Sequence, residues 1–138
     1  MANVVVDSSA WVEYAEGSEA GERARAYVEG EHALYTPSIV VAELADRSTR
    51  SDRRDAWIDT LYPYIRGHTT IVPLAPDLAD RAGALKWEMR ESNPQAGLAD
   101  AIVLATAREH DARVLTGGPD FLVPALADEV IDVTDTDE

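Results

Sequence analysis

The chain has 138 residues and no cysteine, which excludes disulfide bonds, a thiolate nucleophile and a cysteine-based zinc site. This length suits one compact α/β domain, and a hydrophobic fraction of 46% is enough to build its core. No apolar stretch approaches the roughly 20 residues of a membrane span, and the N-terminus lacks the basic flank of a signal peptide. We therefore expect a single domain over residues 1–138, located in the cytoplasm.

The charge balance is strongly acidic. There are 26 acidic against 12 basic residues, for a net charge of −14, and Lys86 is the only lysine. Two interpretations are open: an ordinary acidic cytosolic protein, or a halophilic one whose self-repulsion is screened over about 3 Å at 1 M salt. The scarcity of lysine beside abundant Asp, Glu and Ala favours the halophilic interpretation. The acidic tail, residues 134–138, is predicted to be disordered.

Strand and helix patterns alternate along the chain. The β-branched run from Val4 to Val6 is typical of a buried parallel strand, and Ser8 can cap the helix after it. Pro37 is placed to open the helix that follows the second strand. Such alternation predicts an α/β fold, a parallel sheet with helices on both faces. In chain order, the predicted elements are a strand at 4–6, a helix from 8, a helix at 19–28, a strand at 33–36, helices from 37 and at 55–65, a strand at 70–73, helices at 77–89 and 97–110, and strands at 112–115 and 130–133.

Three carboxylates interrupt these apolar segments. Asp7 ends the first strand, while Glu43 and Asp100 lie within apolar helical runs. A lone charge in such surroundings is costly unless it is paired or binds a metal, and the three runs contain no Arg or Lys. Several carboxylates that converge on one divalent cation would remove the cost together.

The predicted topology makes such convergence plausible, because ligands bind outside the carboxyl ends of parallel strands. Asp7 lies at one such end, and Asp120 follows the strand that ends at Leu115. Asp100 lies near a helix N-terminus, where negative charge is favoured. Simpler interpretations stay open for each residue: Asp7 and Asp100 as helix caps, Glu43 as a solvated helix position, and Asp120 as a turn residue.

Four segments in this order resemble the PIN-domain family, especially the VapC-type toxin ribonucleases. The resemblance implies a Rossmann-like α/β/α sandwich with a sheet of four to five strands and an acidic site that binds Mg²⁺ or Mn²⁺ and cuts RNA. Asp7, Glu43 and Asp100 match the family's acidic positions, and Asp7 and Asp100 are the expected metal ligands. The four segments are Val4 to Trp11, Tyr35 to Leu44, Gly97 to Val103, and Val114 to Phe121.

One departure from the family pattern concerns the fourth acid. Family members often carry an acid two residues after the threonine of the last segment, and Gly118 stands there. We expect either that Asp120 serves instead or that the site works with three carboxylates. Ser9 and Thr116 are hydroxyls placed to support the site through hydrogen bonds.

The expected reaction is hydrolysis of an RNA phosphodiester bond, in which the metal activates water and neutralises charge on the phosphate. Glu43 would bind the metal directly or through water and orient the attacking water. Arginines just beyond Glu43 can hold phosphates, or can form a solvated, salt-bridged face. These candidate RNA-binding residues are Arg47, Arg50, Arg53 and Arg54.

The resemblance also implies partners: a small antitoxin with a basic tail, and a second copy of the chain. The apolar and aromatic residues of segment 55–65 support a homodimer, because a small domain can leave part of them unburied. Two alternatives stay open, a PIN-like module that binds RNA or protein without cutting, and a processing nuclease without a toxin role. Receiver and haloacid-dehalogenase-type domains are disfavoured, since Ser8 and Ser9 stand where those folds need acids.

Overall fold

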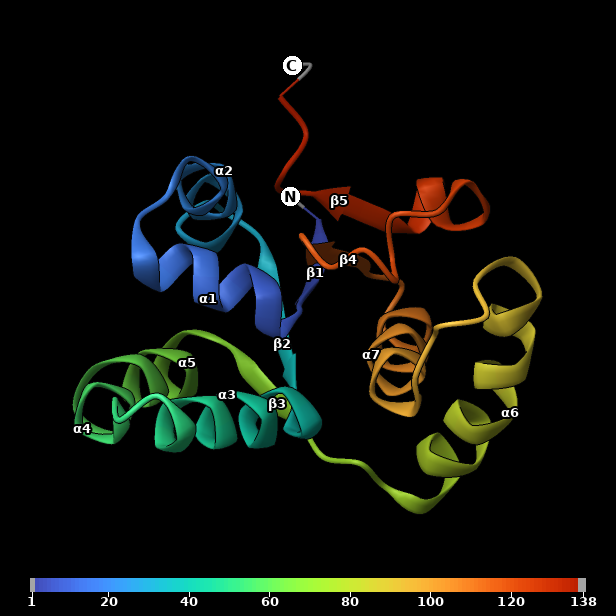
Figure 1. Cartoon of the computed structure of the whole chain (residues 1–138), viewed down its shortest axis with the longest axis horizontal. Coiled ribbons are helices and arrows are strands. Elements are labelled where there is room, and N and C mark those ends of the chain that lie inside the picture. Colours follow the sequence, from blue (N-terminus) through green and yellow to red (C-terminus); the bar gives the residue numbers. More distant parts are fainter. Residues whose placement is uncertain (1, 137–138) are drawn as a thin grey trace.

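Five parallel strands form one sheet in a computed structural model that describes residues 2–136 (Figure 1). The strand order is β3-β2-β1-β4-β5, so the first strand of the chain lies at the centre. β1 pairs in parallel with β2 and β4, and its three valines, Val4 to Val6, are fully buried because helices cover both faces. The strands are β1 (Asn3–Val6), β2 (Ala33–Pro37), β3 (Thr70–Val72), β4 (Arg113–Thr116) and β5 (Val130–Asp132).

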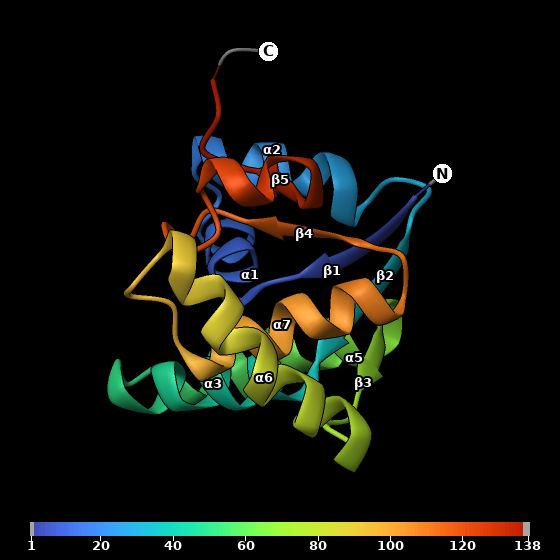
Figure 2. The same cartoon turned by 90° about the vertical axis from the view of Figure 1, so that its right-hand side faces the viewer.

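Helices lie in two layers around the sheet. Helices α1 to α5 lie on one side of it, and α7 followed by α6 lie on the other (Figures 1 and 2). Seven consecutive residues of α7, residues 101–107, are buried, because this helix lies between the sheet and α6. The helices are α1 (Ser8–Glu16), α2 (Glu19–Val28), α3 (Ser38–Arg50), α4 (Arg54–Ala56), α5 (Tyr62–His68), α6 (Pro76–Ser92) and α7 (Leu98–Glu109), with a 3₁₀ helix η2 (Pro124–Glu129) before β5.

This architecture confirms the predicted α/β/α fold with a parallel sheet. Two local predictions differ. Pro37 closes β2 with extended backbone angles and precedes α3, so the helix begins at Ser38. The helix predicted at 55–65 contains a π-helical turn, η1 (Trp57–Leu61), between α4 and α5. Pro63 has no N–H to donate to the preceding turn, which is where the regular hydrogen-bond pattern is interrupted.

The expected surplus of apolar surface in this segment is mostly absent. Trp57 is only 4% exposed, and Leu61, Tyr62 and Tyr64 are half-buried against the core. Ile58 alone among these side chains is strongly exposed, at 49%. The homodimer therefore stays a prediction without the support expected from this segment.

The acidic end of the chain is partly described. Residues 134–136 are exposed, and the backbone N–H and hydroxyl of Thr134 both donate to Asp132 Oδ1, at 2.8 and 2.6 Å. The rest of the tail predicted to be disordered, residues 137–138, lies outside the described residues. None of the helices within residues 2–136 has the length and apolar character needed to cross a membrane.

Candidate active site

Asp7 is the most buried carboxylate at the carboxyl edge of the sheet. It follows β1 directly and precedes α1, and its side chain is 7% exposed. Thr116, the last residue of β4, donates a hydrogen bond from its hydroxyl to Asp7 Oδ2 at 2.8 Å, and Ser9 donates to the same oxygen at 3.2 Å. Within residues 2–136, Asp7 Oδ1 accepts no side-chain hydrogen bond. Hydroxyl groups thus fix one oxygen, and the backbone N–H of Ser8 also donates to the carboxylate.

The two hydroxyls are themselves held by the loop after β4. Ser9 Oγ and Thr116 Oγ1 lie 3.0 Å apart, and the backbone N–H groups of Gly117 and Gly118 donate to them at 3.0 and 2.9 Å respectively. The supporting role expected for Ser9 and Thr116 is what the contacts show. A Cβ added at Gly118 would lie 3.7 Å from Asp7 Oδ2, so a side chain at this position would enter the same site.

Glu43 and Asp100 reach this edge from two helices. Glu43 is half-buried in the second turn of α3. Asp100 is in the first turn of α7, and its Oδ2 accepts a hydrogen bond from the backbone N–H of Gly97 at 3.0 Å. The predicted position of Asp100 near a helix N-terminus is therefore confirmed. The partial positive charge of this helix end favours a carboxylate there.

The pKa values of these carboxylates are raised together. Burial is the largest cause for Asp7, whose pKa rises even though Thr116 and Ser9 oppose the shift. The pKa of Glu43 is raised by burial and then by the charge of Asp7. Burial and the charges of Asp120 and Asp7 raise the pKa of Asp100 to about 6. Because the charges of Asp7 and Asp100 raise the pKa of Glu43, and the charge of Asp7 also raises that of Asp100, the three carboxylates share one region of negative potential.

Asp120 joins this region from the loop after β4. Its side chain interacts with Asp100, and Asn93 donates from Nδ2 to Asp120 Oδ1 at 3.1 Å. Sequence analysis missed Asn93, which follows α6 directly, because a lone Asn-Pro step in a loop carries no chemical pattern. The structure thus brings all four predicted carboxylates, Asp7, Glu43, Asp100 and Asp120, to one edge of the sheet.

The donor set has the chemistry of a site for a hard divalent cation. It consists of carboxylate oxygens, which Mg²⁺ and Mn²⁺ prefer, and none of the four carboxylates forms an ion pair with a basic side chain within residues 2–136. As they stand, however, no three acidic or histidine side chains in the described chain are arranged to hold a metal ion. The carboxylates suit Mg²⁺ or Mn²⁺ in their chemistry, but their side chains must move closer together to bind the cation.

Three of the four candidate RNA-binding arginines line two neighbouring hollows. Arg47 and Arg50 line a hollow that also contains Glu43, Ser8 and Ser9, so they lie beside the acidic edge. Arg50 is also paired with Asp46 on the next turn of α3, at 3.0 Å. Arg53 lines a second hollow further from the carboxylates, and Arg54 begins α4. The structure therefore brings two of the four arginines to the site.

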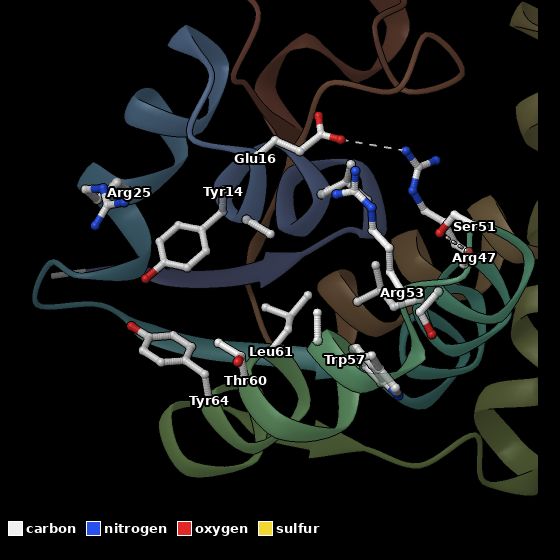
Figure 3. Close-up of a pocket in the computed structure, with 15 residues that line it drawn as sticks. Tyr14, Glu16, Arg25, Arg47, Ser51, Arg53, Trp57, Thr60, Leu61 and Tyr64 are labelled. Atoms are coloured by element: carbon white, nitrogen blue, oxygen red, sulfur yellow. Dashed lines mark hydrogen bonds and ion pairs between the residues drawn. The ribbon is translucent and has the colours of Figure 1, made fainter.

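The second hollow is a mostly apolar groove of about 470 Å³ between α1 and the segment from α3 to α5 (Figure 3). Leu44, Trp57 and Leu61 contribute its apolar lining, and Tyr14 and Tyr64 lie side by side at one end, with ring centroids 5.7 Å apart. Its polar rim consists of Glu16, Arg25, Arg47 and Arg53, and Arg47 pairs with Glu16 at 3.9 Å. Sequence analysis did not predict this groove.

A parallel α/β sheet with carboxylates at its carboxyl edge defines the general class of fold. The particular family follows from the sequence: residues 4–125 match the family profile described as "PIN domain", so the chain belongs to the PIN-domain family. PIN domains are a nuclease family and are generally metal-dependent. No curated protein sequence matches the chain significantly.

Solved structures agree on the fold. The chain is similar to VapBC2 from Rickettsia felis bound to a promoter DNA fragment, with a TM-score of 0.73 and 16% identity over 94% of this chain and 98% of that one. It is similar to a toxin-antitoxin complex from Klebsiella pneumoniae (TM-score 0.68, 22% identity, 94% and 97% covered). It is also similar to VapC20 from Mycobacterium tuberculosis, a sarcin-ricin loop cleaving toxin, with a TM-score of 0.69 and 19% identity over 86% of this chain and 92% of that one.

Proposed function

We propose that the chain is a metal-dependent endoribonuclease whose active site consists of Asp7, Glu43, Asp100 and Asp120. The observation that carries the proposal is the group of four carboxylates at one sheet edge, none of them paired with a basic side chain within residues 2–136 and three with raised pKa values. Such a group serves stability poorly, because each negative charge disfavours the others. Membership of a nuclease family agrees with a catalytic use for it.

In this proposal Asp7 and Asp100 hold Mg²⁺ or Mn²⁺, with Asp120 as the fourth acid. The bound cation supplies an activated water and neutralises charge that grows on the scissile phosphate. Thr116 and Ser9 hold Asp7 Oδ2 and so fix the orientation of the carboxylate that would bind the cation. Glu43 orients the attacking water, and Arg47 and Arg50 hold RNA phosphates beside it.

The test is RNA cleavage with and without Mn²⁺ by the wild type and by Asp7→Asn and Asp100→Asn. Each variant should lose more than about a hundredfold in rate, since it removes a proposed metal ligand while retaining the side-chain shape. Asp128→Asn is the matched control, because Asp128 is exposed on η2, away from the acidic edge, and should cut at the wild-type rate. Wild-type cleavage by either site variant contradicts this active site, and a wild type that binds RNA without Mn²⁺-dependent cleavage favours a binding module.

We further propose a toxin role, with a small antitoxin as partner. Support comes from similar folds crystallised in toxin-antitoxin complexes. A basic tail on the partner suits the acidic edge, and an apolar helix flanked by acids suits the groove with Arg25, Arg47 and Arg53 on its rim. Co-expression with the product of the adjacent gene should yield one complex with no RNA cleavage. Full cleavage in that complex, or no small partner gene, points to a processing nuclease instead.

A further inference from the structure

Trp87 is the most exposed large apolar side chain within residues 2–136, at 65%. Helix α6 buries Leu78, Ala82, Leu85 and Met89 on its inner face toward α7, and Trp87 lies on the opposite face. Figure 2 shows α6 as an outer helix, with its outer face open to solvent. An indole in this position adds nothing to the hydrophobic core, and an exposed tryptophan is typical of a binding surface.

Two cations accompany the indole ring. Lys86 Nζ and Arg90 Cζ each lie 5.3 Å from the centroid of the Trp87 ring. Neither cation pairs with a carboxylate within residues 2–136, although Glu88 and Glu91 are close in sequence. In a chain with a net charge of −14 and a single lysine, two unpaired cations around one exposed aromatic ring form a distinct local surface.

Hydrogen bonds connect this surface to the acidic edge. Arg90 donates from Nε to the carbonyl of Ala96 at 2.8 Å, and Ala96 adjoins Gly97, which holds Asp100. Trp87 precedes the end of α6 by five residues, about 8 Å along the helix axis. Asn93, the next residue after α6, donates to Asp120. A strand that enters the acidic edge can therefore also reach Trp87.

We propose that Trp87, Lys86 and Arg90 form a platform on which an unpaired base of the RNA substrate stacks. This inference rests on the proposed ribonuclease function and adds that the substrate is single-stranded beside the cut. Stacking on an aromatic ring accepts any base and depends little on charge, which suits an acidic protein. Arg90 is held by Ala96, whereas Lys86 is free to leave the ring and contact a phosphate. A nucleic acid is favoured over a protein partner, because the two cations beside Trp87 complement a polyanionic strand.

The indole fluorescence provides a direct test. Trp11 and Trp57 are 0% and 4% exposed, so quenching by an added oligonucleotide reports on Trp87. In EDTA, which prevents cleavage, a single-stranded RNA of mixed sequence should quench the wild type to saturation, and a perfect RNA duplex should not. By anisotropy of labelled RNA, Trp87→Ala should weaken binding at least about fivefold, and Trp87→Phe should retain most of it.

Ile58→Ala is the control, because Ile58 is also exposed but lies on η1. It should bind RNA like the wild type. A wild type that cuts RNA without quenching, with Trp87→Ala binding equally well, overturns the platform alone. A change from dimer to single-chain mass in Trp87→Ala, measured by light scattering, assigns Trp87 to a protein contact and also overturns it. A wild type that neither binds nor cuts RNA overturns both proposals.

Discussion

The acidic edge of the sheet and the apolar groove beside it are built from opposite kinds of side chain. The edge holds four carboxylates, and hydroxyl, amide and backbone N–H groups rather than cations donate hydrogen bonds to Asp7, Asp120 and Asp100 respectively. The groove has an apolar lining with three arginines on its rim. Arg47 lines both the groove and the hollow that contains Glu43, so the two regions adjoin. This difference agrees with the two roles proposed above, RNA cleavage at the edge and partner binding in the groove.

The largest expected effect separates these two roles. Thr60 is an exposed residue of the groove lining, and Thr60→Glu places a negative charge where we expect a partner with acids beside an apolar stripe. Affinity for the adjacent gene product should fall about a hundredfold, as at an interface hot spot, while RNA cleavage stays within about twofold of wild type. Titration calorimetry and a cleavage assay measure the two quantities. Asp7→Asn should abolish RNA cleavage and retain most of the affinity, because three carboxylates remain at the edge for a basic tail. Loss of both affinity and cleavage in Thr60→Glu would remove the distinction.

A tenfold effect is expected inside the acidic edge. Asp120→Ala removes the carboxylate that interacts with Asp100 and should lower Mn²⁺ affinity or cleavage rate by about tenfold. Gly118→Asp should restore part of the loss, because a side chain there approaches Asp7 Oδ2, with a close contact of 3.3 Å to Thr116 Oγ1 to accommodate. Unchanged Mn²⁺ affinity and rate in Asp120→Ala would leave a site of three carboxylates.

Salt should stabilise the whole chain, since the net charge of −14 makes the folded state repel itself. The melting temperature should rise by roughly 5 °C or more between dilute buffer and molar KCl. A variant with several exposed acids changed to amides should respond less. A melting temperature that does not depend on salt contradicts the halophilic interpretation.

The smallest expected effect is on the stability of the metal-free protein. Folding raises the pKa of Asp100 from 3.8 to about 6, so its contribution to stability is present below pH 4 and is lost as the pH rises through 6. The amide side chain of Asp100→Asn stays neutral, so at pH 7 the free energy of unfolding should exceed that of the wild type by about 1 kcal/mol after allowance for solvent screening. Thermal melts in EDTA should show this gain shrinking toward zero at pH 4. A gain that persists at pH 4 has another origin.

The sequence predicted the acidic edge far better than the groove, for a physical reason. A carboxylate in an apolar run is anomalous by itself, so Asp7, Glu43 and Asp100 could be found one at a time, and the parallel topology indicated where they meet. The groove is composed of ordinary amphipathic residues from α1 and from α3 to α5. Each of these helices shows a typical pattern alone, and the hollow exists only in their packing.

The same limit explains the local differences. The helical pattern of segment 55–65 was found, but the π-helical turn before Pro63 depends on hydrogen bonds that periodicity does not specify. The surplus apolar surface expected there is mostly absent because Trp57 stacks on Tyr62, with ring centroids 5.0 Å apart, and periodicity does not specify this contact. Asn93 was missed because its importance comes from a contact 27 residues away, with Asp120.

The central place of β1 has a consequence for synthesis of the chain. β1 leaves the ribosome before β4, which is one of its two neighbours, and the hydroxyl that holds Asp7 belongs to Thr116, which is 109 residues further on. No truncated chain that lacks β4 can hold Asp7 in this way or bury both edges of β1. The nascent polypeptide therefore lacks the complete candidate site until β4 has been made, and for the proposed ribonuclease this order of synthesis delays any action on nearby RNA.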